Sequence, residues 1–399
     1  MDTDPQTTNY RAQIIEQGYT IIRETIPRHR LEHLRQCFET MATRQFDRWH
    51  RDPHPENQWP VAFHARQPRL LFQTVVDEST SDSIELCLSD STLGVSRELM
   101  QAPKAAPTLL SMMCNPAEDY GPDKWHRDIR PSGLAPLAGL QNDARANSPA
   151  YVQWNIPLYD DNVLWVVPSS HWRINTAGEN KALARDPAKP VPGGVPVDLA
   201  AGDAVVYLNT MLHWGSNYST KRRRTIHLGY RAFGGAIYPH ANGFNWDLEF
   251  TANVAGNIRE RFEHFFALHK QEREVIKSVL RAILWGDSTV FQERLAVLHP
   301  GEHGRMVTLI LLSKFVNRLD GILRQKQFGF DLRKDIAEAF TPNEHLELVR
   351  RFAHLDAALR ADGESAIPGF QEERSEYELN AMPERFGIDE FIASWDATP

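Results

Sequence analysis

A histidine and a carboxylate lie two positions apart in the stretch KWHRDIRP, residues 124–131, as His126 and Asp128. Imidazole nitrogens and carboxylate oxygens are common ligands of transition metals. The His-x-Asp pattern alone is weak evidence, because it occurs by chance in many chains. A metal site therefore requires a third ligand elsewhere in the sequence and a fold that brings it to this pair.

The segment NTMLHWGSNYSTKRRRTIHLGYRAF, residues 209–233, supplies a third candidate ligand. His213 ends an apolar run, as expected of a side chain at the end of a strand, and GSNYST then turns the chain. Two imidazoles and one carboxylate on one side of a metal leave the opposite positions open. This arrangement suits iron(II), which then binds a bidentate cosubstrate and oxygen. We expect His126, Asp128 and His213 to form such a site.

The strand after this turn alternates, so Arg224 shares a face with apolar residues such as Ile226 and Leu228. A buried guanidinium is costly unless an anion meets it, and its planar fork suits a carboxylate. We expect Arg224 to face inward and to hold the far carboxylate of a 2-oxo diacid. His227 lies on the other face and is expected to point outward or to pack.

The 399-residue chain has 42% hydrophobic and 24% charged residues and a formal net charge of −8. These proportions are typical of a globular protein, and the negative charge argues against a general nucleic-acid binder. No stretch approaches the roughly 18 uncharged apolar residues that span a bilayer, and the polar N-terminus does not resemble a secretory signal. Three scattered cysteines, Cys37, Cys87 and Cys114, favour reduced thiols over disulfides or a zinc cluster. We expect a soluble, cytoplasmic protein without nucleic-acid or membrane partners.

The elements that must position these residues divide the chain in two. Residues 10–245 read as short β-branched and aromatic runs separated by turn residues, with an amphipathic helix over residues 28–46, which predicts an antiparallel sandwich or barrel. Residues 175–196 are rich in Pro, Gly and Ala without periodicity, which indicates a long surface loop or lid. After about residue 250 the pattern becomes helical. We therefore expect a β domain, residues 1–248, and a C-terminal helical region, residues 249–399.

Several motifs resemble the phytanoyl-CoA dioxygenase family of iron(II)/2-oxoglutarate oxygenases. They are EQGYTIIRETIPRHRLEHLRQ near the start, WHRD, VQWNIPLYDDNVLWVVPSSH, and AGDAVVYLNTMLHWGSN followed by an arginine 11 residues after the histidine. The resemblance implies a double-stranded β-helix (jelly-roll) core with His126, Asp128 and His213 as iron ligands. It also implies that Arg224 anchors 2-oxoglutarate. The expected reaction uses O2 to hydroxylate or otherwise oxidise an unactivated C–H bond of a small-molecule metabolite, with release of succinate and CO2.

Four further residues are candidates for ligand contacts. Gln153 and Asn155 alternate with apolar neighbours on a strand that should line the core, so either could donate to 2-oxoglutarate or substrate, or face solvent. Arg130 is near enough to the metal motif to meet an anionic substrate, whereas Arg127 should point away from the metal. His171 in PSSHW is expected near the mouth of the barrel, as a structural residue or a substrate contact.

Two other functions remain open on the sequence alone. One is a catalytically silent jelly-roll that binds a partner through its helical half. The other is a zinc hydrolase that uses the same three ligands, although no general base is evident. The helical region could cover the barrel mouth, form a homodimer or dock a carrier, and its sequence does not choose among these.

Overall fold

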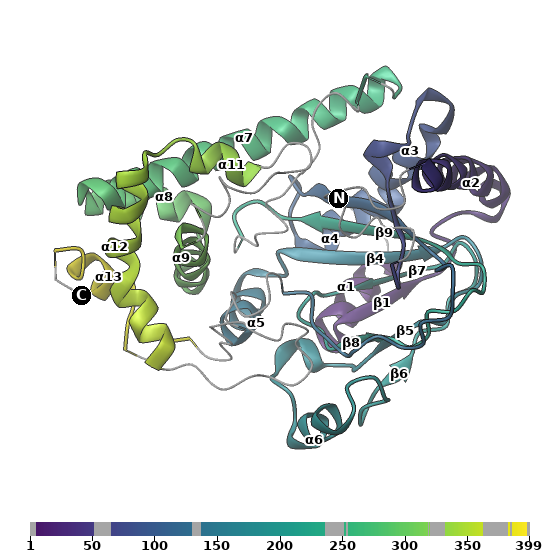
Figure 1. Cartoon of the computed structure of the whole chain (residues 1–399), viewed down its shortest axis with the longest axis horizontal. Coiled ribbons are helices and arrows are strands. Elements are labelled where there is room, and N and C mark those ends of the chain that lie inside the picture. The colour runs from purple at the N-terminus through teal and green to yellow at the C-terminus, as the bar shows by residue number, and fades with distance from the viewer. Residues whose placement is uncertain are drawn as a thin grey trace.

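The computed structural model describes residues 5–51, 65–129, 137–235, 251–252, 254–317, 319, 332–361, 382–383 and 385–396. Figure 1 shows a β-rich lobe on the right and a helical lobe on the left, and the long helix α7 (Gly256–Trp285) runs along both. Among the described residues, no helix combines the length and apolar composition needed to span a bilayer. The expected β core and the helices that follow it are both present.

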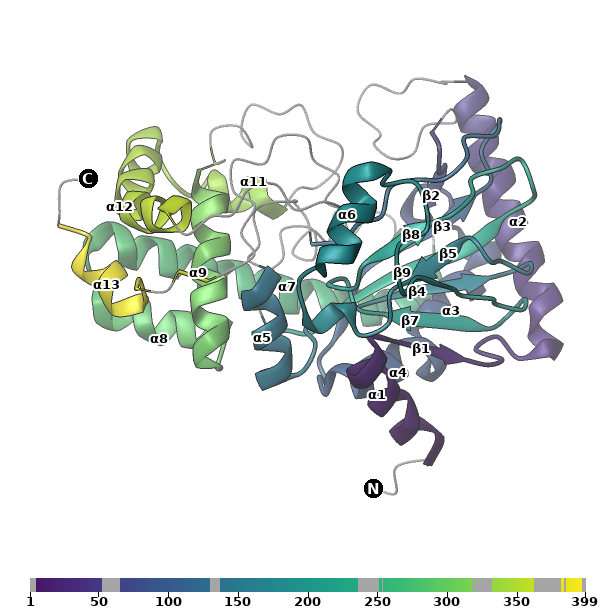
Figure 2. The same cartoon turned by 90° about the horizontal axis from the view of Figure 1, so that it is seen from below.

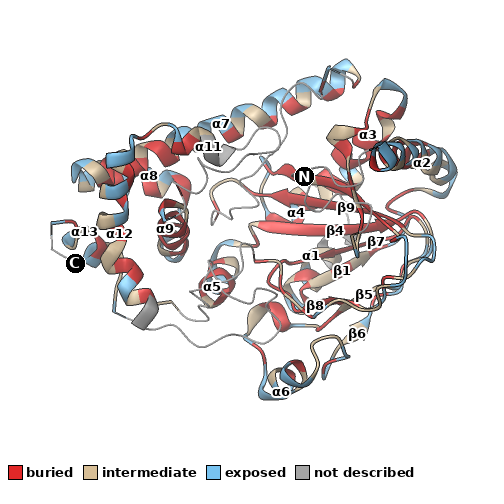
Figure 3. Cartoon of the chain, in the orientation of Figure 1, coloured by how far each residue is buried: buried red, intermediate tan, exposed pale blue. Residues whose placement is uncertain are grey.

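The main sheet of the β lobe has six antiparallel strands. Their order across the sheet is β1 (Tyr19–Ile22), β7 (Ala204–Tyr207), β4 (Tyr151–Pro157), β9 (Arg224–Arg231), β3 (Ala106–Cys114) and β2 (Arg69–Leu71). Strands β1, β4, β7 and β9 carry several β-branched or aromatic residues, which suit a pleated surface that is buried on both faces, whereas β2 and β3 consist mainly of Leu and Met. Figure 3 shows these strands as mostly buried.

One face of the main sheet packs against helices. They are α2 (Arg28–Arg51), α3 (Asp82–Leu88), α4 (Val95–Met100) and the first half of α7. Helix α2 buries Leu34, Phe38 and Met41, which recur every three or four residues, in the same apolar cluster as Trp154 of β4. The Trp154 indole Nε1 donates to Ser96 Oγ of α4 at 2.9 Å. This face of the sheet is therefore the apolar core of the lobe, and the opposite face is left for other residues.

The second sheet of the lobe is small. Its antiparallel strands are β6 (Val195–Pro196), β5 (Leu164–Val166) and β8 (His213–Gly215), in that order. An isolated antiparallel bridge joins His126 to His213 at its edge. Two antiparallel sheets agree with the sandwich or barrel that the sequence predicts.

The segment over residues 175–196 differs from the expected loop, because it contains helix α6 (Ala177–Arg185). Thr176 Oγ1 accepts from the Glu179 backbone N–H and the Glu179 carboxylate accepts from the Thr176 N–H, which is a capping box. Leu183 of α6 lies in one apolar cluster with Val191 and Trp125. The pattern Thr-x-x-Glu marks the start of this helix, although the surrounding Pro and Gly residues are typical of a loop.

The helical lobe has a core of its own. It is built from the second half of α7, α8 (Ser288–Leu298), α9 (Glu302–Val316), α11 (Leu332–Ala337), α12 (Pro342–Ala361) and α13 (Ile388–Ala393). The predicted boundary between residues 248 and 249 falls among residues that the structure does not describe. Helix α7 continues through both cores, with Phe262 in the first and Val279 in the second.

Helix α5 (Leu137–Asn147) lies between the two lobes (Figure 2). Its Leu140 packs with Val307 of α9. His299, in the connection between α8 and α9, is fully buried, and its Nε2 lies 2.9 Å from Asp143 Oδ1 on α5. His299 Nδ1 accepts from the Gly301 backbone N–H at 3.0 Å, so the Nε2 proton points to the carboxylate.

We predict that Asp143→Ala lowers the free energy of unfolding by about 2 kcal/mol, because it leaves the buried His299 N–H without an acceptor. Urea denaturation followed by circular dichroism measures the change. Asn142→Ala, at the exposed neighbouring position of the same helix, should alter stability by less than about 0.5 kcal/mol. Equal midpoints for Asp143→Ala and the parent would show that the buried pair does not stabilise the fold.

Candidate metal centre

The three predicted ligands come together at the edge of the small sheet. His126 and His213 form the antiparallel bridge, and each backbone N–H donates to the other's carbonyl oxygen at 2.9 Å. Their ring centroids are 4.3 Å apart. The Asp128 N–H donates to the Asn209 carbonyl at 2.8 Å, which holds the next turn in place. The possible ligand atoms of His126, Asp128 and His213 all lie within 4.8 Å of one another.

Both histidines are fixed in the tautomer that metal binding requires. His126 Nδ1 lies 2.8 Å from the Lys124 carbonyl oxygen, and His213 Nδ1 lies 3.0 Å from that of Met211. A carbonyl only accepts, so each Nδ1 carries the proton and each Nε2 keeps its lone pair. The Nε2 atoms of His126 and His213 lie 3.7 and 3.3 Å from the oxygens of Asp128. Metal-binding histidines use this backbone support.

The charge states also suit a cation. Burial, and then the charge of the neighbouring His213 ring, lower the pKa of His126 to about 4. Burial alone would raise the pKa of Asp128, but the His213 ring and the Gln153 hydrogen bond outweigh it and hold that pKa below its ordinary value. A neutral imidazole and an ionised carboxylate are the forms in which these groups bind metals. The Asp128 side chain is 23% exposed, so the cluster is reachable from outside.

Gln153 of β4 orients the carboxylate ligand. Its Nε2 donates to Asp128 Oδ2 at 2.8 Å and lies 3.2 Å from the Tyr207 hydroxyl. Asn155, two residues along the same face, has its Oδ1 2.8 Å from His227 Nδ1. The sequence allows both amides to contact cosubstrate or substrate, but the structure places Gln153 on a predicted metal ligand and Asn155 on His227. Of the two alternatives for His227, outward or packed, the structure shows the packed one, because its ring is buried on the cluster's side of the sheet.

Arg127 points away from the cluster, as expected, and holds the backbone behind it. Its Nε donates to the Thr210 carbonyl at 2.9 Å, Nη1 to Asn175 Oδ1 at 2.8 Å and Nη2 to the Ser170 carbonyl at 3.1 Å. Burial lowers the pKa of Arg127 to about 9, so the group stays charged at neutral pH. The guanidinium thus joins two segments to the strand between His126 and Asp128.

Stacked indoles flank the two histidines. Trp125 precedes one ligand and Trp214 follows the other, and their rings stack with centroids 5.3 Å apart. The Trp125 Nε1 donates to the Lys189 carbonyl at 2.8 Å, so the segment that contains α6 is fastened to this stack. A Cβ at Gly194 would lie 2.9 Å from the Trp125 ring, so glycine permits the close approach. The 175–196 segment therefore packs against the Trp125–Trp214 stack, which lies next to the two histidines in the chain.

Arg224 does not face the cluster, which corrects the sequence-based expectation. In the sheet register it pairs with Cys114, on the face that α2 covers. Its Nε lies 3.2 Å from Glu39 Oε2, Nη1 donates to Asn115 Oδ1 at 3.0 Å, and the guanidinium carbon is 5.5 Å from the Phe46 ring centroid. The alternation along β9 is as predicted, but the apolar face points at α2. The anion that meets Arg224 is a carboxylate of the protein itself.

A different arginine lies on the cluster's face. Arg69 of β2 pairs with Met113, and Met113 pairs with Thr225, whose face is that of His227. The Arg69 Nε and Nη2 donate to Gln67 Oε1 at 3.1 and 2.7 Å. Burial, and then the positive charge of Arg69, lower the pKa of His227 to about 3. Sequence reasoning missed Arg69, because β2 has three residues and no periodicity; only the register reveals its face.

Arg223 lies near the same face but is neutralised within the protein. Its Nε lies 2.7 Å from Asp161 Oδ2, and that oxygen also accepts from the Thr225 hydroxyl at 2.5 Å. The Asp161 side chain is 7% exposed. Arg223 therefore forms a buried ion pair with Asp161, which connects the start of β9 to the turn before β5.

One of the two remaining candidates, His171, is not at the cluster. His171 is fully buried, and its Nε2 donates to the Ile15 carbonyl of α1 (Pro5–Gln17) at 3.0 Å. Burial lowers the pKa of His171 to about 4, so it packs as a neutral ring beneath Gly18. The structure thus supports a structural role for His171 and not the alternative substrate contact. Arg130 lies outside the described residues.

We predict that Gln153→Ala weakens metal binding at the cluster about 10- to 100-fold, because the carboxylate ligand loses its orienting hydrogen bond. Isothermal titration of the apoprotein with Fe(II) under anaerobic conditions measures the dissociation constant. Asn155→Ala is the matched control on the same strand face and should change affinity by less than about threefold. The prediction fails if both variants bind iron as the parent does.

No known family model matches the chain, and no curated protein matches it in sequence. Solved structures similar in shape include the non-heme alpha-ketoglutarate-dependent epimerase SnoN from nogalamycin biosynthesis, at 18% identity and a TM-score of 0.40 over 59% of this chain and 87% of that one. AviO1 from Streptomyces viridochromogenes Tue57 is 20% identical, with a TM-score of 0.42 over 60% and 100%. EctD from S. alaskensis with 2-oxoglutarate and 5-hydroxyectoine is 15% identical, with a TM-score of 0.43 over 58% and 79%. These likenesses are distant, so we base the proposal below on this chain's own residues.

Proposed function

We propose that the chain is an iron(II)- and 2-oxoglutarate-dependent oxygenase that oxidises a C–H bond of a small molecule. One observation carries the proposal: His126, Asp128 and His213 present two Nε2 atoms and one carboxylate to a common point, with both Nδ1 protons held by backbone carbonyls. This donor set is typical of non-heme iron(II) oxygenases. The proposal includes the jelly-roll connectivity and the phytanoyl-CoA dioxygenase family that the sequence resembles.

The donor set fits iron(II) better than a structural zinc ion. It has three ligands and no thiolate, whereas structural zinc sites have four protein ligands and are rich in cysteine. When bound, iron(II) with 2-oxoglutarate would supply oxygen activation coupled to release of succinate and CO2. The residues of the chain would hold the metal and fix the carboxylate through Gln153, and the Trp125–Trp214 stack would hold together the two segments that carry the histidines.

Arg69 is the residue that we assign to the far carboxylate of 2-oxoglutarate. It is a cation on the cluster's face of the main sheet, whereas Arg224 pairs with Glu39 on the other face. Arg223 forms a buried ion pair with Asp161 at the turn before β5. A guanidinium binds a carboxylate through two parallel N–H donors, so Arg69 can orient the diacid as well as attract it.

We predict that the iron(II)-loaded protein develops a weak visible charge-transfer band when 2-oxoglutarate is added without oxygen. His213→Ala should abolish the band, because one metal ligand is lost. Arg69→Gln should raise the 2-oxoglutarate dissociation constant about 10- to 100-fold, the usual worth of a charged hydrogen bond. Arg224→Gln is the matched control and should leave it within about threefold.

Three outcomes would contradict this account. No band despite bound iron would remove the oxygenase assignment. If Arg69→Gln leaves the band unchanged and Arg224→Gln weakens it, then Arg224 binds the far carboxylate of 2-oxoglutarate, as the family resemblance implies. Metal-dependent hydrolysis without any 2-oxoglutarate requirement would favour the zinc hydrolase.

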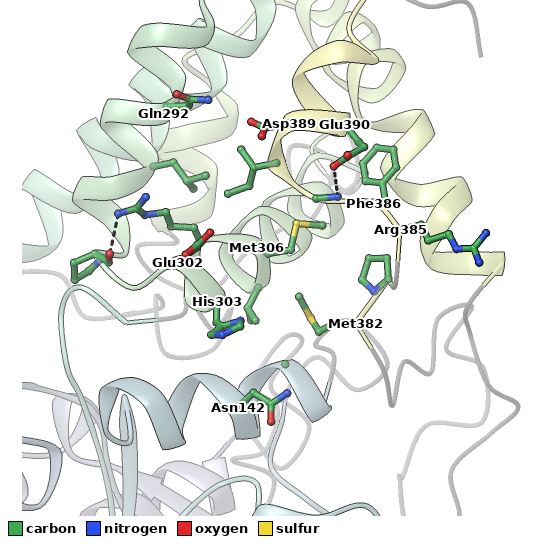
Figure 4. Close-up of a pocket in the computed structure, with 18 residues that line it drawn as sticks. Asn142, Gln292, Glu302, His303, Met306, Met382, Arg385, Phe386, Asp389 and Glu390 are labelled. Atoms are coloured by element: carbon green, nitrogen blue, oxygen red, sulfur yellow. Dashed lines mark hydrogen bonds between the residues drawn. The ribbon is translucent and has the colours of Figure 1, made fainter.

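A second candidate function, a binding module that acts through the helical half, is favoured by one observation. A pocket of about 1220 Å³ lies between α5, α8, α9 and the segment before α13. Figure 4 shows His303 and Met306 of α9 and Met382 around this space, with Asn142 of α5 below it. None of the candidate site residues lines it. If the protein binds no 2-oxoglutarate, a binding function of the helical half becomes the preferred proposal.

A further inference from the structure

A second group of possible metal ligands lies on α2 and α3, helices that cover the face of the main sheet opposite the His126–Asp128–His213 cluster. It consists of His33 and Cys37 of α2 and Asp82 of α3, whose possible ligand atoms all lie within 4.8 Å of one another. His33 Nε2 is 2.5 Å from Asp82 Oδ2 and 3.9 Å from Cys37 Sγ. One imidazole nitrogen therefore faces both a thiol and a carboxylate.

Helix geometry explains how two of these residues meet. His33 and Cys37 are four residues apart on α2, so their side chains lie one above the other. His29 lies one turn earlier on the same stripe and is exposed. Asp82 comes from the first turn of α3, which packs against α2. The arrangement thus combines a two-residue helical chelate with a ligand from a second helix and has a further imidazole within one turn.

The distances suit a tetrahedral zinc ion after a small adjustment. Zinc bonds of about 2.3 Å to sulfur and about 2.0–2.1 Å to nitrogen or oxygen place neighbouring ligand atoms about 3.3–3.6 Å apart. The His33–Cys37 separation of 3.9 Å is close to this range. The shorter His33–Asp82 contact must open by about 1 Å, and the Asp82 side chain, 44% exposed, has room to move.

We propose that His33, Cys37 and Asp82 form a zinc site that joins α2 to α3, with His29 or water as the fourth ligand. The thiolate distinguishes this site from the His126–Asp128–His213 cluster and favours zinc over iron(II). The competing description is a surface ion pair, His33–Asp82, above a buried cysteine. The proposal is independent of the oxygenase assignment.

Cobalt(II) titration of the full chain tests the proposal, because cobalt bound to a thiolate gives a strong near-ultraviolet charge-transfer band that histidine and carboxylate ligands do not give. Because the His126–Asp128–His213 cluster also takes up divalent metal, we expect the band to be complete after two equivalents of cobalt in the parent and after one equivalent in His126→Ala, and excess zinc to bleach it. Cys37→Ser should remove the band. Cys114→Ser, a change at another buried cysteine, and His126→Ala, a change at the other cluster, should both keep it.

Two variants at exposed positions keep the test decisive if Cys37→Ser folds poorly. Asp82→Asn and His33→Ala should each weaken cobalt binding at least tenfold by the same band. The proposal is overturned if the band is absent from the parent, or persists in Cys37→Ser. It is equally overturned if both exposed variants bind cobalt as tightly as the parent, which would leave only the surface ion pair.

Discussion

The candidate metal centre depends on one pair of backbone hydrogen bonds, those that join His126 to His213. The two residues are far apart in the chain, and their N–H and carbonyl groups pair across an antiparallel bridge at 2.9 Å in each direction. The bridge brings both imidazoles to one side, while Asp128 reaches them from two residues further on. The supporting contacts then act on this geometry: Arg127 holds the backbone behind the bridge, backbone carbonyls fix both tautomers, and Gln153 fixes the carboxylate.

The two faces of the main sheet have different roles, which decides what each arginine can do. The apolar face packs against α2, so the charge of Arg224 is met by Glu39 of that helix. The side chains of Gln153, Asn155 and His227 lie on the other face, which faces the small sheet. Arg69 reaches this face from the last strand of the sheet. The cation of Arg69 and the carboxylate of Asp128 on this side of the sheet underlie the proposed binding of a carboxylate-bearing cosubstrate, whereas the other face packs against helices.

Much of this arrangement follows from local sequence patterns, and the rest requires tertiary information. The alternation along β9 correctly places Arg224 and His227 on opposite faces of the sheet. The pattern does not say which face α2 covers, because that depends on the packing of a helix that is distant in the sequence. Arg69 lies on a three-residue strand with no period to detect. Helix α6 was predictable in principle from the Thr176-to-Glu179 capping box, which the surrounding Pro and Gly obscured. Cys37 and Asp82 are neighbours only through the packing of α2 on α3.

The central claim is that His126, Asp128 and His213 together hold a divalent metal. Crystals grown anaerobically with Fe(II), measured on both sides of the iron absorption edge, test it most directly. The account predicts an anomalous difference peak between the two Nε2 atoms and the Asp128 carboxylate. A protein that binds iron but shows no peak there, or shows it only beside His33 and Cys37, would contradict the account.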